Sequence, residues 1–233
     1  MIQNSFIMEK LRTTCDTLKK QILSPYEDIV GLEIAPGEYQ EQLTPPADGW
    51  RPFVPGERVE GYDAHFWFRG KIHTPAAQEG KRIMLQIHTG FEEKWNSRNP
   101  QCLIYLNGVM TQAMDTNHYR VPLECDTEYD LLVSFWVGMD RVKVDFLPSL
   151  VWNDDRIEGM YYDLFVPYEG CKLYENDGVT YARVTTVLER AVNLIRFQEP
   201  FSPEYYESLE AARAFLKEEF YEKMCGDTDA IVN

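Results

Sequence analysis

Hydrophobic and polar residues alternate with a period of two between Ala64 and Val151, which indicates β-strands that each bury one face. Four runs show this pattern, at residues 66–72, 83–87, 131–137 and 142–146. In the first run Phe66, Phe68 and Ile72 are expected to face the core, with Trp67 on the polar side. No helical pattern separates the runs, so we predict an antiparallel β-sandwich and not a parallel α/β sheet.

A hairpin is predicted where Asn107-Gly108 separates the apolar run 103–106 from Val109. Asn-Gly supplies the positive φ angles that a two-residue type I′ turn requires. By contrast, residues 35–61 are rich in proline and glycine, and they predict turns and extended chain that cross a surface.

Helical spacing appears at both ends of the chain. From Phe6 to Ile22 apolar residues recur every three to five positions, and Ser24-Pro25 ends this amphipathic helix. After Trp152 the helical spacing returns in two stripes. The first consists of Val184, Val187, Leu188, Ala191 and Ile195, and the second of Leu209, Ala212, Leu216, Phe220 and Met224. We predict two antiparallel helices from these stripes.

The second of these carboxyl-terminal helices has recognisable ends. Ser202-Pro203-Glu204 offers an N-cap, a proline at the first helical position and an acid in the first turn, and Gly226 offers a C-cap. The chain then divides into an amino-terminal helix and arm (1–30), a β-sandwich (31–152), a helical linker (153–226) and an apolar strand start (227–233).

Charge and composition exclude several classes of protein. The 233 residues include 23 Lys plus Arg and 38 Asp plus Glu, a net charge of 23 − 38 = −15, which argues against binding to nucleic acid. No run approaches the roughly 18 apolar residues of a membrane span. The five cysteines are odd in number and far apart, which is typical of reduced thiols, so we expect a cytoplasmic protein.

Residues with catalytic or metal-binding chemistry do not form a recognisable motif. His65, His73, His88 and His118 lack the spacing of a zinc site, and no Gly-x-Ser-x-Gly turn or phosphate-binding glycine loop occurs. The acidic segment 153–158 could hold a general acid and base, but adjacent carboxylates at a helix start are more typical of caps. We therefore predict no catalytic and no metal-binding residue.

One loop has the composition of a sugar-binding site. Trp95 lies close to Asn96 and Arg98, so its ring could stack on a pyranose while the polar groups take hydroxyls. Alternatively, Trp95 folds back on the sheet edge or meets another domain. For Asp115 and His118, which follow the hairpin, a turn-stabilising pair is favoured over a site.

The succession of these features resembles the amino-terminal domain of α-mannosidases of glycoside hydrolase family 38. The match covers nearly the whole chain. Its segments are Ala64-His65-Phe66-Trp67-Phe68-Arg69, Pro75, Gly80, 83–87, Leu106-Asn107-Gly108, Asp115-x-x-His118, 130–136, Tyr161-Tyr162-Asp163-Leu164 and Leu188-Glu189-Arg190-Ala191-Val192-Asn193-Leu194. Aromatic-rich strands with Leu-Asn-Gly also resemble the sugar-binding sandwich of family 2 glycosidases, but the downstream helices favour the mannosidases.

This resemblance sets the functional expectation. The fold would be mainly β with α: an antiparallel jelly-roll β-sandwich of the galactose-binding type, with an amino-terminal helix and a carboxyl-terminal helical hairpin. The chain would end where a catalytic barrel begins, at 227–233, before the His-x-His-x-x-Asp segment whose residues bind a divalent metal, commonly zinc.

The full-length protein would hydrolyse α-mannosidic bonds with retention, whereas the present residues would be inactive alone. Its partners would be that catalytic domain, a second subunit and mannosides. The alternative is a stand-alone carbohydrate-binding module.

Overall fold

The computed structural model describes residues 2–38, 44–92, 99–140, 143–174 and 177–226. Two compact units are present, one formed by Ser24–Trp152 and the other by Met1–Leu23 together with Asn153–Asn233. The expected start of a barrel strand at 227–233 lies outside the described residues. None of the described helices combines the length and the apolar character needed to cross a membrane.

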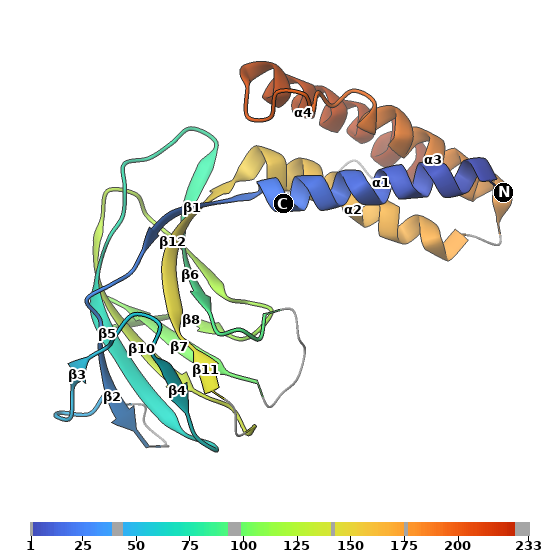
Figure 1. The fold of residues 1–233 in the computed structure, drawn as a ribbon. Helices are drawn as coiled ribbons and strands as arrows, with labels where there is room; N and C mark the ends of the chain where they lie inside the picture. Colours follow the sequence, from blue (N-terminus) through green and yellow to red (C-terminus); the bar gives the residue numbers. More distant parts are fainter. Residues whose placement is uncertain (1, 39–43, 93–98, 141–142, 175–176, 227–233) are drawn as a thin grey trace. The chain divides into compact units, whose positions relative to one another are not determined.

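The first unit is built from two main sheets, with antiparallel pairing in the strand registers that the structure gives (Figure 1). The larger sheet has six strands, in the order β3 (Arg51–Pro52), β2 (Glu33–Gly37), β5 (His65–His73), β10 (Glu128–Trp136), β7 (Gln101–Leu106) and β8 (Val109–Met114). The smaller has four, in the order β1 (Leu23–Asp28), β12 (Leu147–Asp154), β6 (Lys81–His88) and β9 (Arg120–Leu123). A two-stranded ribbon pairs β11 (Lys143–Asp145) with β4 (Arg58–Glu60).

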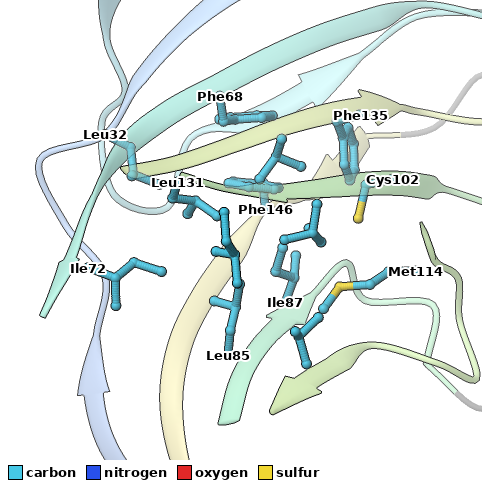
Figure 2. Close-up of a cluster of buried hydrophobic side chains, with 14 of the residues drawn as sticks. Leu32, Phe68, Ile72, Leu85, Ile87, Cys102, Met114, Leu131, Phe135 and Phe146 are labelled. Atoms are coloured by element: carbon cyan, nitrogen blue, oxygen red, sulfur yellow. The ribbon is translucent and has the colours of Figure 1, made fainter. Parts of the chain in front are cut away.

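Apolar side chains from both main sheets form one core, which confirms the predicted mainly β sandwich. The centre is aromatic: Phe68 of β5 and Phe146, which precedes β12, stack with ring centroids 3.6 Å apart (Figure 2). Phe135 of β10 meets both rings edge to face. Because all three side chains are fully buried, each removes a large apolar area from water.

The predicted hairpin is confirmed in detail. Asn107 and Gly108 have φ angles of 52° and 79°, as a type I′ turn needs, and Leu106 pairs with Val109 across the turn. The Asn107 side chain also accepts a hydrogen bond of 2.8 Å from the backbone N–H of Asp130, so the turn is fixed to the neighbouring strand β10.

Two expectations for the sandwich require correction. The segment 35–61, predicted as turns and extended chain that cross a surface, also joins the sheets: it contributes the end of β2, β3 and β4, and it buries Ala35, Phe53 and Val59. Trp67 is not on a solvated side: it lies on the face of β5 opposite the core and is only 3% exposed. Period-two alternation shows which residues share a face, but it does not show whether further side chains cover that face.

The second unit consists of helices around its own core. They are α1 (Ile2–Gln21), α2 (Asp155–Cys171), α3 (Gly178–Val192) and α4 (Pro203–Leu216), with the short 3₁₀ turn η1 (Lys172–Tyr174) and the π-helical segment η2 (Lys217–Cys225). Leu11 of α1, Met160 of α2 and Leu188 of α3 are fully buried in one cluster. The expected two-helix hairpin is therefore incomplete. The sequence pattern had not singled out α2 as a long helix, and α1 shares the core of the helices that follow the sandwich.

Capping explains the acidic segment at the start of α2. Asp154 is the N-cap and accepts hydrogen bonds of 3.2 Å from the backbone N–H groups of Arg156 and Ile157. Asn153 donates to both Asp155 and Glu158, at 3.0 and 2.9 Å. These contacts confirm the capping interpretation of residues 153–158.

The second helix predicted from the sequence also has the expected ends. The Ser202 hydroxyl accepts from the Tyr205 backbone N–H at 3.1 Å, and Pro203 opens α4. Gly226 closes the helical region with a φ of 68°, in the left-handed conformation that glycine adopts without strain.

Removal of the Phe146 ring should destabilise the sandwich strongly. We expect Phe146→Ala to lower its free energy of unfolding by about 3–5 kcal/mol, because a fully buried aromatic ring leaves a cavity against Phe68 and Phe135. Urea unfolding measures the change. Leu147→Ala, at a neighbouring side chain that is 44% exposed, is the control and should change the free energy much less. Equal losses for the two variants would contradict the packing described here.

The helical unit should lose stability at alkaline pH. Burial, together with a 2.7 Å hydrogen bond to Asp154, raises the pKa of Tyr206 to about 12, and burial raises the pKa of Tyr221 to about 12. Because the unfolded chain releases these protons near pH 10 and the folded unit retains them, stability present below pH 10 is lost as the pH rises towards 12.

Urea unfolding followed by helical circular dichroism at pH 8 to 11 measures this loss. Tyr206→Phe should show a smaller pH dependence than the unmodified chain, and Tyr162→Phe, on the exposed part of α2, controls for removal of a phenol. An unchanged dependence in Tyr206→Phe would contradict the assignment.

Candidate functional site

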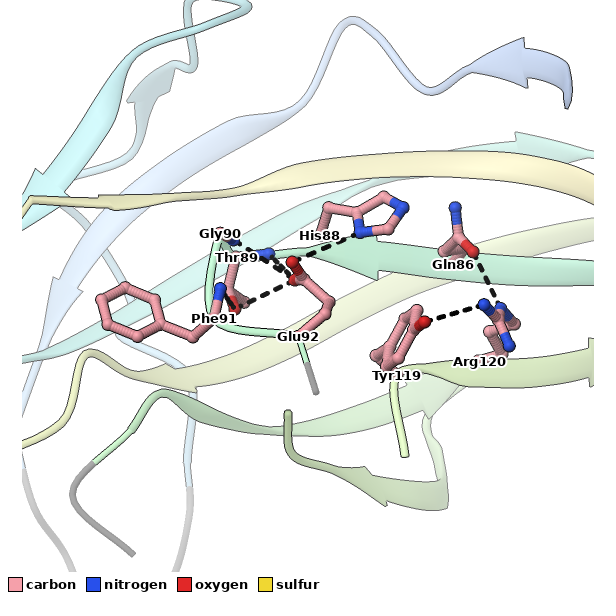
Figure 3. Close-up of polar contacts among 8 residues, drawn as sticks. All are labelled: Gln86, His88, Thr89, Gly90, Phe91, Glu92, Tyr119 and Arg120. Carbon is pink, nitrogen blue, oxygen red and sulfur yellow. Dashed lines mark hydrogen bonds and ion pairs between the residues drawn. The ribbon is translucent and has the colours of Figure 1, made fainter. Parts of the chain in front are cut away.

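The residues predicted to contact sugar, Trp95, Asn96 and Arg98, lie outside the described residues. The start of their loop is well defined (Figure 3). The Glu92 carboxylate accepts from the backbone N–H of Thr89, from its hydroxyl at 3.2 Å and from the N–H of Gly90 at 3.2 Å. Burial would raise the pKa of Glu92, but these donors together with His88, 3.6 Å away, outweigh it and lower the pKa.

Beside this turn, three polar side chains are bonded to one another. Arg120 donates to the Gln86 amide oxygen and to the Tyr119 hydroxyl, both at 2.8 Å, and its guanidinium lies 4.4 Å from the centre of the Tyr119 ring (Figure 3). The Arg120–Gln86 hydrogen bond joins β9 to β6, which pair at these two residues, so this cluster has a structural role in the sheet.

Asp115 and His118 form the turn-stabilising pair that the sequence favoured. One Asp115 oxygen accepts from the backbone N–H groups of Asn117 and His118, at 2.8 and 2.7 Å, and lies 3.1 Å from the His118 ring nitrogen Nδ1. The carboxylate is used to fix the chain reversal after β8.

A pocket of about 400 Å³ opens on the outer face of the six-stranded sheet, meaning the face opposite the aromatic core. Alternation along β10 creates this face: Val133 and Phe135 enter the core, so Ser134 and Trp136 point the other way. The pocket is lined by Asp63, His65, Gln101, Cys102, Leu103, Ala113, Met114, Ser134 and Trp136.

The Trp136 side chain is held in place by Asp63. Its indole N–H donates to the Asp63 carboxylate at 2.7 Å. Asp63 has a left-handed backbone with φ of 55°, and its N–H donates to the carbonyl oxygen of Gly138 at 3.0 Å. The next contact, from the Val137 N–H to the Ala64 carbonyl oxygen, also measures 3.0 Å. The loop before β5 and the end of β10 thus fix the indole before any ligand arrives.

The described residues around the pocket include neither a reactive thiol nor a set of metal ligands. Cys102 borders the pocket, but its side chain belongs to the buried core, and burial raises the pKa of its thiol to about 12, so it stays protonated and unreactive. Within the part of the chain that the structure describes, no three His, Cys, Asp or Glu residues gather into a set that could hold a metal ion. The other lining side chains form an apolar wall with a carboxylate, an imidazole, an amide and a hydroxyl beside it.

Sequence reasoning missed this site because its parts are far apart in the chain. Trp136 and Asp63 belong to different segments, and only the pairing of β10 with β5 brings Trp136 opposite His65. One signal was available: Trp136 stands at an outward position of a predicted strand, beyond the core-facing residues Val133 and Phe135.

Comparisons with known proteins do not identify a family. No family model and no curated protein matches the chain. Among solved structures, a β-glucuronidase of Ruminococcus gnavus is 13% identical with a TM-score of 0.31, over 57% of this chain and 28% of that one. A structure described as CBM51-2 in complex with GlcNAc and INT domains, from Clostridium perfringens ZmpB, is 12% identical with a TM-score of 0.20, over 84% and 41%. This chain therefore spans less than half the length of each, and scores this low support no argument about function.

Substitutions at Asp63 should separate backbone strain from the indole contact. We expect Asp63→Ala to lower the free energy of unfolding of the sandwich by about 1–3 kcal/mol, because alanine disfavours positive φ and cannot accept from Trp136. Asp63→Asn tolerates positive φ and keeps an oxygen that can accept from Trp136, so it should lower the free energy of unfolding much less. Asp63→Gly tolerates positive φ and loses only the hydrogen bond. Chemical denaturation measures the series, and equal stability of the alanine and asparagine variants would refute the described contact.

Proposed function

We propose that the β-sandwich binds carbohydrate without hydrolysing it, in the pocket formed around Trp136. The observation that carries this proposal is the indole itself: it lines a pocket of about 400 Å³ and is fixed in orientation by Asp63. A rigid aromatic plane can stack on the apolar face of a pyranose at little cost in conformational entropy.

Polar groups around the indole match the hydroxyls of a sugar. Gln101 offers an amide donor and acceptor, Ser134 a hydroxyl, and Asp63 a carboxylate that can accept from sugar hydroxyls. Among the described residues of the lining, Asp63 is the one carboxylate, and none is a lysine or an arginine. A neutral sugar therefore suits the pocket better than an acidic sugar, whose charge the carboxylate would repel.

The wider context that we propose rests on the sequence resemblance. The sandwich would be a jelly roll of the galactose-binding type, in the non-catalytic amino-terminal region of a cytoplasmic α-mannosidase-like glycosidase. Its ligand would then be a mannoside, and the divalent metal of that enzyme class would belong to the catalytic domain. A stand-alone carbohydrate-binding module would use the same pocket.

A second candidate function is a scaffold that packs against another domain, and the helical unit supports it. Tyr162 and Val166, one turn apart on α2, are 53% and 58% exposed, and Leu173 of η1 is 85% exposed. Exposed apolar side chains grouped along one helix are typical of protein contacts. A scaffold alone needs no sugar binding, so a titration separates the two functions.

Isothermal titration with methyl α-mannoside tests the proposal. The 233-residue chain should bind the sugar, and Trp136→Ala should weaken binding by about tenfold or more, because the stacking plane is lost. Tyr26→Ala is the matched control, since Tyr26 is a half-exposed aromatic residue on β1, in the other sheet. Absence of binding would overturn the proposed function and favour the scaffold. Binding that Trp136→Ala leaves unchanged would overturn the proposal that the sugar binds in the Trp136 pocket.

A further inference from the structure

The outer face of the six-stranded sheet continues beyond the pocket as a row of apolar and aromatic side chains. Along β10 the outward positions after Trp136 are Ser134 and Leu132, and these pair with Leu103 and Tyr105 of β7. Tyr105 in turn pairs with Met110 of β8. We call Leu103, Leu132, Tyr105 and Met110 the outer strip.

A buried aromatic side chain packs beside the strip. Trp67 of β5 is buried beside it, with its ring 6.1 Å from that of Tyr105. Gly37 of β2 makes this arrangement possible, because a Cβ atom at that position would lie 2.8 Å from Trp67 Cδ1. Tyr105 therefore has a buried aromatic ring at its side, and Met110, its partner on β8, is 60% exposed. A supported aromatic ring that is still partly accessible is a ready stacking surface.

Leu103 belongs to both the strip and the pocket lining, whereas distance along the sheet separates Tyr105 and Met110 from Trp136. Trp136 and Leu132 are four residues apart on β10, which corresponds to about 13 Å at roughly 3.3 Å per residue. One pyranose ring cannot cover both aromatic groups at once. Two sugar units, one at each aromatic side chain, are needed to use the whole surface.

The charges at the edge of the strip are paired. The Arg69 guanidinium, on the strand next to β10, bonds Glu33 at 2.6 Å and lies 4.2 Å from the centre of the Trp50 ring. Because Arg69 is already paired, this described cation beside the strip offers little counter-charge for an acidic glycan.

From this surface we infer that the ligand is a neutral oligosaccharide, with one sugar unit in the Trp136 pocket and a further unit over Tyr105 and Met110. This inference rests on the proposed sugar binding at Trp136 and adds a second subsite to it. Polar contacts in the pocket orient the first unit, and the strip contributes affinity through stacking and apolar contact.

Titration of the 233-residue chain with methyl α-mannoside and with an α-linked mannotriose tests the inference. The trisaccharide should bind roughly tenfold more tightly than the monosaccharide, which is the gain expected from one additional aromatic contact. Tyr105→Ala should remove this gain and leave the affinity for methyl α-mannoside unchanged. Tyr105→Phe keeps the ring and should retain the gain, and thermal unfolding of both variants shows whether the sandwich stays folded.

Each other outcome has a distinct meaning. Equal affinities for the two ligands, or a Tyr105→Ala variant that retains the gain, would overturn the second subsite and leave sugar binding at Trp136 intact. If Tyr105→Ala lowered the affinity for both ligands by the same factor while the variant stayed folded, Tyr105 would belong to the pocket and the inference would fail. Failure of both ligands to bind would overturn the proposed function, and the inference with it.

Discussion

The alternation of side chains along β10 is the constraint on which the sandwich and its candidate site both depend. Val133 and Phe135 enter the core, so the residues between and after them, Ser134 and Trp136, must face the other way. A shift of one residue in the pairing would exchange these two sets. The stacked rings of Phe68 and Phe146 prevent that shift, because they hold Phe135 on the core side.

Loop contacts then convert an outward tryptophan into a defined surface. Trp136 alone would be a side chain with several available rotamers at the end of a strand. The Asp63 carboxylate, carried on a backbone with positive φ, accepts a hydrogen bond from the indole N–H, and this bond selects one orientation of the indole. The cost of the left-handed conformation is small for aspartate, and the neighbouring backbone hydrogen bonds offset it. Preorganisation of this kind lowers the entropic cost of binding, which matters for a ligand as weakly held as a single sugar.

The helical unit shows how polar groups can specify a helix start inside a buried environment. Asp154 is almost fully buried, yet its carboxylate accepts from two backbone N–H groups and from the Tyr206 hydroxyl. A buried carboxylate of this type is stable only when its hydrogen bonds are satisfied. Those contacts give the carboxylate of Asp154 a structural role as the cap of α2, which explains the acidic segment 153–158 without a catalytic role.

Local chemistry in the sequence determined the elements and many of their ends: the period-two strands, the Asn107-Gly108 turn, the Asp115 and His118 pair, and the cap at Ser202. Each depends on residues that are neighbours along the chain, so the sequence alone contains the necessary information. Tertiary structure decided the rest. It brought β2 to the edge of β5, buried Trp67 on a face expected to be polar, and placed Asp63 against Trp136. These contacts join residues that are distant in the chain, and alternation within one strand does not reveal which other strand or loop will cover it.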